Sequence, residues 1–248
     1  MNIVGIIPSR YASTRLPAKP LVNICGKTMI QRVYEQAMKS ALLTTVVVAT
    51  DDVRIETAVR QFNGQVQMTP VDIHSGSDRI ALVAKDLRAD IVVNIQGDEP
   101  LIDPQLIDQA IRALIDDTNA VVSTAVKRTS AHQDIFNPNV VKAVLDKGNY
   151  ALYFSRSPVP YVRDAKKDED WFNGTIFYKH FGIYVYRADF LQQYTTLTQS
   201  PLEVAEKLEQ LRILENGFRI KCVITEYESH PVDTPEDLQK VIQIIQKQ

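Results

Sequence analysis

The chain has 248 residues, of which 45% are hydrophobic and 23% are charged. Its 28 basic and 30 acidic residues give a net charge of −2, so no overall field attracts nucleic acid and no such partner is expected. Any anion site must therefore be built from local clusters. No apolar run is long enough to span a membrane, and the N-terminus lacks the layout of a signal peptide. We expect no stable insertion into a membrane.

The two cysteines, Cys25 and Cys222, lack the spacing of metal ligands. A reduced, cytoplasmic setting is the simplest interpretation, although the sequence leaves a disulfide between them open.

Apolar runs alternate with helical patterns in the first half of the chain. We expect strands at residues 3–7, 45–49, 65–68, 90–95 and 120–126, and helices at residues 28–40, 53–62, 77–87 and 104–116. This rhythm predicts an α/β fold with a doubly wound, mostly parallel sheet. Right-handed crossovers bring the carboxyl ends of the strands to one edge, where ligands bind.

The second half has a different pattern. It predicts strands at residues 140–145, 151–155, 182–186 and 219–225, helices at 202–216 and 235–247, and a charged loop at 163–174. Without a repeat or a linker, we expect one domain over residues 1–248, with a β-rich excursion at about 140–190.

The loop after the first strand is rich in cations and hydroxyls. It carries Arg10, Arg15, Lys19, Ser9, Ser13 and Thr14. Fixed cations and small donors at the carboxyl end of a strand suit a polyphosphate, so the loop indicates nucleotide chemistry.

Two acidic positions are candidates for holding a metal. Asp98 follows an apolar strand, where a carboxylate can hold Mg²⁺ against phosphates, or can simply cap the helix near Pro104. Asp233 precedes a helix that begins near Pro235, and the local pattern favours a capping role for Asp233 or Thr234. Asp233 is a second metal ligand only if the fold brings it beside Asp98.

Other candidates have an ordinary structural interpretation beside the functional one. The turn at Ser75 can meet a ribose, base or phosphate, or it can be a plain helix start. Strand alternation places His180 and Tyr184 on one face. Arg156 can bind a substrate carboxylate or form a surface ion pair. Glu209, Gln210 and Arg212 can line a sugar pocket or pair on a helix surface.

Together these segments resemble the 3-deoxy-D-manno-octulosonate (Kdo) cytidylyltransferases, also called CMP-Kdo synthetases, over essentially the whole chain. The matching motifs begin at Ile7, Ala49, His74, Asn94, Phe136, Tyr150, Lys179, Leu208 and Val232. The last three read Lys-His-Phe-Gly-Ile-Tyr-Val-Tyr, Leu-Glu-Gln-Leu-Arg and Val-Asp-Thr-Pro-Glu-Asp-Leu.

The resemblance implies a Rossmann-like nucleotidyltransferase that couples CTP to Kdo, releases pyrophosphate, uses Mg²⁺ and forms a homodimer. Its product serves lipopolysaccharide biosynthesis.

The resemblance also implies roles for individual residues. The nucleotide would be held by Arg10, Ser13, Arg15, Lys19, Ser75, Arg79 and Gln96. Lys19, Arg15 and Asp98 would act in catalysis, and Asp98 and Asp233 would bind Mg²⁺. The acidic sugar would meet Arg156, His180, Tyr184, Glu209 and Gln210.

The chain departs from the family pattern at two places. His230-Pro231 precedes Val232-Asp233 where the family usually has Gly, and Ala18 stands before Lys19 where it usually has Gly. The first exchange changes the backbone freedom leading to a proposed metal ligand. The second is the milder change unless the position of Ala18 needs a positive φ.

Rival functions remain open at this point. They are the same reaction on 8-amino-Kdo or on another acidic sugar such as sialic acid, the use of UTP or GTP, and a nucleotide-binding relative without catalysis. A nicotinamide dehydrogenase is disfavoured because no Gly-x-Gly-x-x-Gly follows the first strand.

Overall fold

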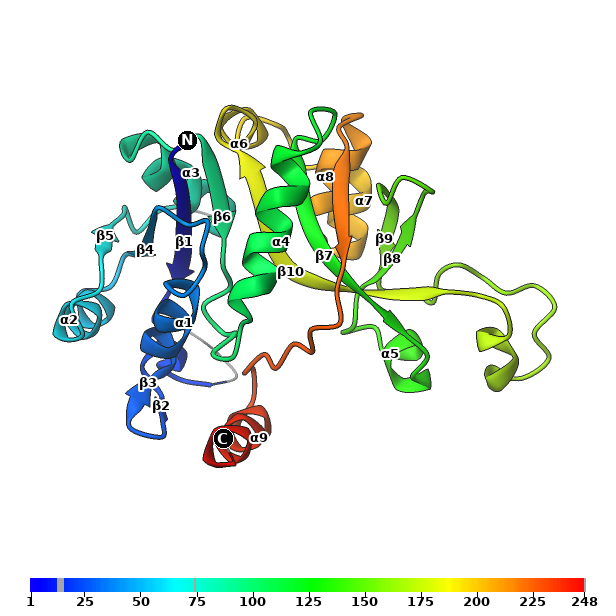
Figure 1. Cartoon of the computed structure of the whole chain (residues 1–248), viewed down its shortest axis with the longest axis horizontal. Coiled ribbons are helices and arrows are strands. Elements are labelled where there is room, and N and C mark those ends of the chain that lie inside the picture. The colour runs from blue at the N-terminus through cyan, green and yellow to red at the C-terminus, as the bar shows by residue number, and fades with distance from the viewer. Residues whose placement is uncertain (13–15, 74, 248) are drawn as a thin grey trace.

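The computed structural model describes residues 1–12, 16–73 and 75–247 (Figure 1). Within these ranges nine strands form one sheet. The predicted Ser13 and Arg15 lie outside the described residues.

The first half builds the parallel part of the sheet. Its strands are β1 (Ile3–Ser9), β4 (Thr45–Thr50), β5 (Val66–Met68) and β6 (Ile91–Asn94), and its helices are α1 (Met29–Ala37), α2 (Val53–Gln61), α3 (Gly76–Asp86) and α4 (Pro104–Ile115). β1 pairs in parallel with both β4 and β6. The chain winds outward from β1 through β4 to β5 and then returns to β6 on the other side. β1 and β6 therefore flank the point where the winding reverses, which is where open α/β sheets bind ligands.

The second half adds strands to the other side of β6. They are β7 (Val122–Thr129), β8 (Lys142–Leu145), β9 (Ala151–Ser155), β10 (Phe177–Arg187) and β11 (Ile220–Ile224). The order across the sheet is β11-β7-β10-β6-β1-β4-β5, with β8 paired to β10 and β9 paired to β8. β10 runs antiparallel between β6 and β7, whereas β11 is parallel to β7. The sheet is thus mostly parallel with an antiparallel insertion, as the α/β and β-rich predictions require.

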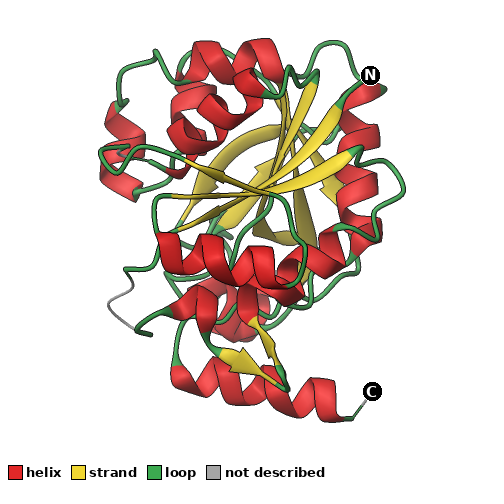
Figure 2. Cartoon of the chain, turned by 90° about the vertical axis from the view of Figure 1, so that its left-hand side faces the viewer, coloured by secondary structure: helices red, strands yellow, loops and turns green. Residues whose placement is uncertain are grey.

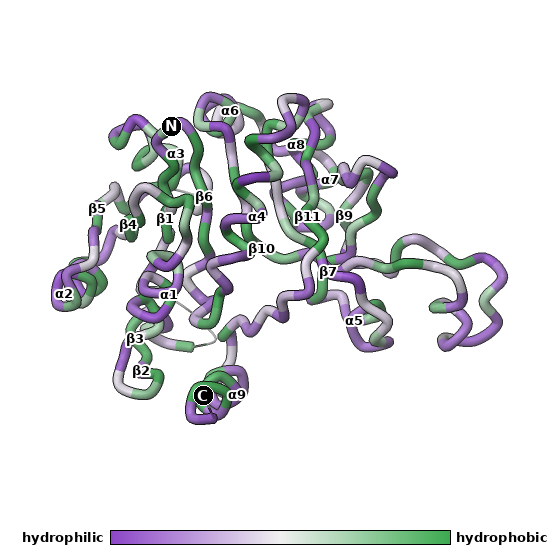
Figure 3. Tube along the Cα trace, viewed as in Figure 1, coloured by the Kyte–Doolittle hydropathy of each residue, from purple (hydrophilic) through white to green (hydrophobic). Residues whose placement is uncertain are grey.

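Helices cover both faces of the sheet (Figure 2). Buried residues of α1, α2 and α4 pack with Ile7 and Val48 on one face, whereas those of α3 and α6 (Ala188–Tyr194) pack with Ile6 and Val47 on the other. The apolar strands at the centre of Figure 3 are the ones that these helices cover. Alternating side chains on buried strands account for the two cores.

The structure corrects several local expectations. Instead of one helix at 202–216, α7 (Pro201–Glu206) and α8 (Gln210–Glu215) are separated at Lys207, whose φ is 55°. The short helix α5 (His132–Phe136), the helix α6 and the hairpin of β2 (Asn23–Ile24) and β3 (Lys27–Thr28) were not predicted. The charged loop contains the 3₁₀ turn η2 (Asp168–Phe172). Both cysteines are free thiols, which agrees with the simpler of the two interpretations that the sequence left open.

Candidate active site

Three charged side chains meet at the carboxyl edge of β1 and β6. Lys19 lies in the 3₁₀ turn η1 (Lys19–Leu21), Asp98 follows β6, and Asp233 precedes α9 (Pro235–Gln246). The Lys19 ammonium lies 2.7 Å from Oδ2 of Asp98 and 2.8 Å from Oδ1 of Asp233. Burial disfavours the charged ammonium, but the two carboxylates outweigh it and raise the pKa of Lys19.

Helix caps explain why both carboxylates are available. The N-cap of α4 is Asp103, so Asp98 does not cap this helix. The N-cap of α9 is Thr234, in a capping box with Asp237, and Asp233 is left to meet Lys19.

The unusual His230-Pro231 sequence does not displace the second carboxylate. The amide of Val232, the next residue, donates to the carbonyl of Asp98 at 2.9 Å. This pairing ties the segment before α9 to the loop after β6, so Asp233 stays beside Asp98.

A cavity of about 370 Å³ opens at these charges. It is lined by Pro8, Ser9, Arg10, Ala12, Lys19, Pro20, Gln96, Gly97, Asp98 and Asp233. A Cβ added at Gly97 would lie 3.3 Å from the carbonyl oxygen of Pro8, so the glycine permits the close approach of the two loops. Arg10 donates to the carbonyl of Ile73 at 2.6 Å and presents its cationic group at the rim.

The two carboxylates fit a divalent cation. Both carboxylates contact the ammonium group of Lys19, whose positive charge takes the place that a metal ion would have between them. Among the described residues no group of three or more acidic, histidine or cysteine side chains is arranged to hold a metal ion. A two-carboxylate site suits Mg²⁺, which keeps several waters and takes further oxygen ligands from substrate phosphates.

A second cavity, of about 310 Å³, adjoins the first and shares Gln96 with it. Its walls include Tyr184, Glu209 and Gln210, three of the predicted sugar residues. Nε2 of Gln96 donates to the carbonyl of Gly182 at 3.0 Å, which fixes the amide between the two cavities.

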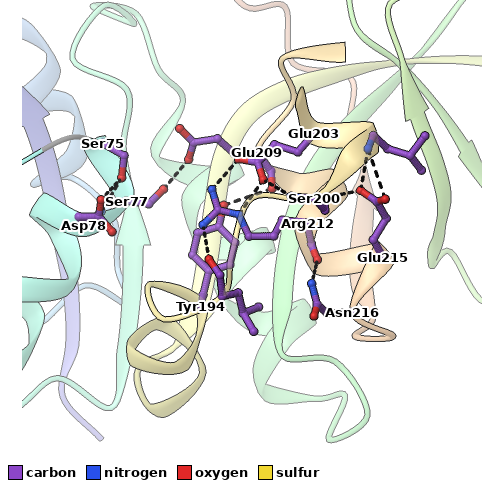
Figure 4. A network of polar contacts seen from close by, with 12 residues as sticks. Ser75, Ser77, Asp78, Tyr194, Ser200, Glu203, Glu209, Arg212, Glu215 and Asn216 are labelled. Atoms are coloured by element: carbon purple, nitrogen blue, oxygen red, sulfur yellow. Dashed lines mark hydrogen bonds and ion pairs between the residues drawn. The ribbon is translucent and has the colours of Figure 1, made fainter. Parts of the chain in front are cut away.

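Glu209 connects the two sides of the second cavity (Figure 4). Its carboxylate accepts a hydrogen bond from the hydroxyl of Ser77 on α3 at 2.7 Å, and its carbonyl accepts one from the hydroxyl of Tyr194 on α6 at 3.1 Å. Arg212, in contrast, forms two hydrogen bonds with Glu203, of 2.7 and 2.5 Å, which raise its pKa. Arg212 therefore braces α8 against α7, while Glu209 reaches α3.

A third cavity, of about 460 Å³, lies on the β10 side and includes His180, Tyr184 and Gln210. The rings of His180 and Tyr184 are 5.4 Å apart, so the predicted shared face exists. Burial lowers the pKa of His180 to about 3, so its imidazole is neutral near pH 7. Lys179 at the same cavity pairs with Glu228 at 2.6 Å and with Asp134 at 3.1 Å.

Three of the predicted ligand-binding side chains form hydrogen bonds or ion pairs with other groups of the protein. The guanidinium of Arg79 is buried and pairs with Asp51 at 2.7 Å. Ser75 is the N-cap of α3, as its structural interpretation predicted. Arg156 donates to the carbonyls of Glu206 and Pro138. Their roles toward ligands stay predictions.

Sequence reasoning missed three polar side chains that support this site. Ser77 binds Glu209, and Thr124 binds His180. Buried Lys142 donates to the carbonyls of Asn137, Val140 and Arg156, of which Val140 lines the third cavity. A hydroxyl or a lone cation inside an otherwise apolar strand was the available signal for Thr124 and Lys142.

The fold and the site define a class of protein. An α/β sheet with cations and paired carboxylates at its switch point is typical of nucleotide-binding enzymes, and the family model described as cytidylyltransferase matches residues 4–221. Named relatives narrow this class. A 3-deoxy-manno-octulosonate cytidylyltransferase of Geobacter metallireducens is 53% identical over 98% of this chain and 97% of its own length, and one of Parabacteroides distasonis is 51% identical over 98% and 97%. The chain belongs to the 3-deoxy-manno-octulosonate cytidylyltransferase family.

Solved structures agree with this assignment. A CMP:2-keto-3-deoxy-manno-octonic acid synthetase complexed with CTP is 44% identical, covers 100% of this chain and 99% of its own, and superposes with a TM-score of 0.92. A cytidylyltransferase of Leptospira borgpetersenii is 18% identical with a TM-score of 0.64 over 100% of this chain and 94% of its own, and this likeness shows the fold alone.

Proposed function

We propose that this chain couples CTP to Kdo and yields CMP-Kdo and pyrophosphate. The convergence of Lys19, Asp98 and Asp233 in a cavity that Gln96 joins to Tyr184, Glu209 and Gln210 supports this proposal most directly. A triphosphate in the first cavity would present its α-phosphorus to a sugar in the second.

The reaction is a direct in-line displacement. The anomeric hydroxyl oxygen of the sugar forms a bond to the α-phosphorus, the bond from that phosphorus to the bridging oxygen breaks, and pyrophosphate leaves. The hydroxyl proton passes to solvent during the attack. No covalent enzyme intermediate is required, so the protein contributes mainly position and electrostatic stabilisation.

Asp98 and Asp233 would hold Mg²⁺, which supplies charge neutralisation at the α-phosphate and lowers the pKa of the attacking hydroxyl. Lys19 would then turn from the carboxylates to the phosphates. Together with Arg10 and Arg15 it would neutralise charge on the triphosphate and the leaving pyrophosphate.

The acidic sugar would lie between the second and third cavities. Tyr184, Glu209 and Gln210 line the second, and His180 lies in the third. Hydroxyl-rich substrates suit this mixture of donors and acceptors. Arg156 would have to give up a hydrogen bond to a backbone carbonyl to reach the sugar carboxylate. Arg79, which is paired with Asp51, would support nucleotide binding indirectly, by stabilising the fold on the nucleotide side.

We also propose a cytoplasmic homodimer that serves lipopolysaccharide biosynthesis. Free thiols at Cys25 and Cys222 suit a reducing compartment. Within the described residues no helix has the length and apolar character needed to cross a bilayer. The large exposed side chains Leu152, Tyr161 and Ile176 all lie in the β-rich excursion and suit a contact between two copies.

The first test is pyrophosphate release with CTP and Mg²⁺, with Kdo and 8-amino-Kdo offered in parallel. Release with Kdo is expected. Pyrophosphate release with the amino sugar alone would keep the mechanism and change the substrate. CTP binding without pyrophosphate release in the presence of either sugar would contradict the proposal.

The second test addresses the metal ligands. We expect Asp98→Asn to bind CTP but to lose at least about a hundredfold in turnover, because charge stabilisation at the phosphate is lost. Asp116→Asn, an exposed carboxylate at the end of α4, is the matched control. Full turnover of Asp98→Asn would refute the metal role.

A further inference from the structure

A buried threonine lies against the histidine of the third cavity. Thr124 lies on β7 and is fully buried. Its Oγ1 is 2.8 Å from Nε2 of His180, 2.7 Å from the carbonyl oxygen of Ile183 and 3.3 Å from that of Phe181. One hydroxyl thus faces one imidazole nitrogen and two carbonyls.

The proton count leaves one arrangement. A hydroxyl has a single proton to donate, and a carbonyl oxygen at 2.7 Å can only accept it. The proton of Thr124 therefore points to Ile183, and its lone pair must accept from His180. Nε2 of His180 carries the hydrogen.

The other ring nitrogen is then left as an acceptor. Because burial keeps His180 neutral near pH 7, a ring with hydrogen on Nε2 has a lone pair on Nδ1. Among the described residues no hydrogen bond to Nδ1 occurs, and Nδ1 is not one of the buried side-chain atoms that lack a partner. Nδ1 thus retains accessible surface on a ring that lines the third cavity.

The same threonine also stabilises an irregularity in β10. The register of β10 against β7 shifts between Phe181 and Tyr184. The two carbonyls that face Thr124 belong to this bulge, and the carbonyl of Gly182 inside it accepts from Gln96. The bulge therefore connects His180 with the amide that lies between the first two cavities.

We propose that Thr124 is a positioning residue that holds His180 as the Nε2–H tautomer, so that Nδ1 accepts a hydrogen bond from a hydroxyl of the sugar. The sugar part of this proposal rests on the proposed function. A carboxylate, which has no proton to give, is not the partner of Nδ1, so His180 distinguishes hydroxyl from carboxylate at this position.

Two variants and a control test the positioning role. Thr124→Val removes the hydroxyl at nearly constant shape, whereas Thr124→Ser keeps it. Ser123→Ala removes a hydroxyl that is also fully buried and donates to the carbonyl of Ala110 at 2.6 Å, but lies one residue away on the other face of the strand. The three proteins separate the loss of this hydroxyl from a general loss in the core.

The tautomer is measured without substrate. The chain has four histidines, so ring-¹⁵N-labelled protein gives a simple long-range ¹H–¹⁵N spectrum, in which His180→Gln identifies the signal of His180. We expect the Nε2–H tautomer in the wild type, Thr124→Ser and Ser123→Ala, and a mixture in Thr124→Val. An Nδ1–H tautomer or an imidazolium in the wild type would overturn the proposal.

Kinetics then tests the link to the sugar. In Thr124→Val we expect KM for Kdo to rise about tenfold, as for the loss of one hydrogen bond, with KM for CTP changed less than about twofold. Thr124→Ser should restore the wild-type value. An equal rise for CTP, or no rescue by serine, would contradict the positioning role.

Failure of the proposed function has a different signature. If neither sugar accepts the cytidylyl group, the part of this proposal that concerns the sugar is refuted. The spectrum of the wild type still decides whether Thr124 pairs with His180 as proposed. If Thr124→Val does not fold, the wild-type tautomer and the serine variant decide.

Discussion

At the scale of single residues, Ala18 shows how this chain departs from its relatives. Its φ is 53° and its ψ is 32°, in the left-handed region, and it immediately precedes Lys19. The family usually has Gly there, which adopts this conformation without the steric cost that a Cβ brings. The position does need a positive φ, so the exchange is not a mild one.

We expect Ala18→Gly to raise the free energy of unfolding by about 0.5–1 kcal/mol. The relief of about 1–2 kcal/mol of left-handed strain exceeds the extra backbone entropy that glycine has in the unfolded chain. Urea denaturation measures the change. Ala205→Gly, at an exposed position within α7, should instead lose about 1 kcal/mol. A loss at both positions would show that Ala18 is not strained.

His180 makes the stability of the fold depend on pH. Burial lowers the pKa of this side chain from 6.5 to about 3, so the unfolded chain binds a proton at a pH where the folded chain does not. The contribution of the neutral imidazole is complete above pH 6.5 and is lost as the pH falls from 6.5 toward 3. At pH 5 the loss is about 2 kcal/mol.

We therefore expect His180→Gln to flatten the curve of unfolding free energy against pH. The variant is first compared with the wild type at pH 8, where the difference reports packing and hydrogen bonds alone. Between pH 7 and pH 5 the wild type should lose about 2 kcal/mol more than the variant. Parallel curves over this range would show that His180 is not held neutral.

At the scale of elements, a buried ion pair joins three segments on the nucleotide side. Arg79 of α3 donates to Asp51, which follows β4, and to the hydroxyl of Thr69, which follows β5. Removing the carboxylate leaves a buried guanidinium without its counter-charge. Such a loss costs about 3–5 kcal/mol in other proteins.

We expect Asp51→Ala to lower the free energy of unfolding by about 3 kcal/mol. The double variant Asp51→Ala/Arg79→Met should recover part of this loss, because an apolar chain replaces the unpaired charge. Asp52→Ala is the control, since Asp52 is the N-cap of α2 and its loss costs about 1 kcal/mol. Weaker CTP binding in Asp51→Ala without a loss of stability would assign Arg79 to the nucleotide instead.

The break between α7 and α8 shows what local patterns leave undetermined. The apolar and polar residues at 202–216 are compatible with one continuous helix. The chain instead turns at Lys207, and the turn brings Glu209 to Ser77 and Gln210 into two cavities. These contacts are between distant segments, so no periodicity in the sequence could indicate them.

At the scale of the whole molecule, local signals predicted most strands and helices in both halves of the chain, whereas the order of the strands in the sheet depends on long-range contacts. Apart from the hairpin of β2 and β3, the strands and helices up to residue 126 follow from apolar periodicity and caps. Lys19 and Asp98 were found because they lie in loops after buried strands. The antiparallel place of β10 between β6 and β7 depends on long-range pairing. Asp233 needed the family resemblance, because its own surroundings favoured a cap.

Supporting side chains were the hardest to predict. Thr124 acts through hydrogen bonds to carbonyls of another strand, and Lys142 connects Arg156 with the turn at Asn137 and Val140. A sequence gives no geometry for such bonds. The sequence signal for such a supporting side chain was a polar residue without an explanation in an otherwise apolar strand. Its partner became visible only when the fold brought the segments together.

The proposed contact between two copies of the chain involves a segment that projects from the sheet. Residues 156–176, here called the arm, extend from the sheet between β9 and β10 at the right of Figure 1. Tyr161 is 75% exposed and packs edge-on against Trp171 with the ring centres 5.4 Å apart, and Ile176 at the other end of the arm is 53% exposed. Burial of such side chains against a second copy would stabilise a dimer by removing their apolar surface from water.

We expect the wild type to sediment at twice the chain mass of 28.0 kDa and the double variant Tyr161→Glu/Ile176→Glu at the single mass, because paired carboxylates in the contact would be desolvated and would repel. Sedimentation equilibrium measures this. Met38→Glu, which changes an apolar side chain that is also 53% exposed but lies at the end of α1, is the matched control and should stay dimeric. If the double variant is dimeric, the contact between the two copies does not involve the arm. If the wild type is monomeric, the dimer proposal is refuted.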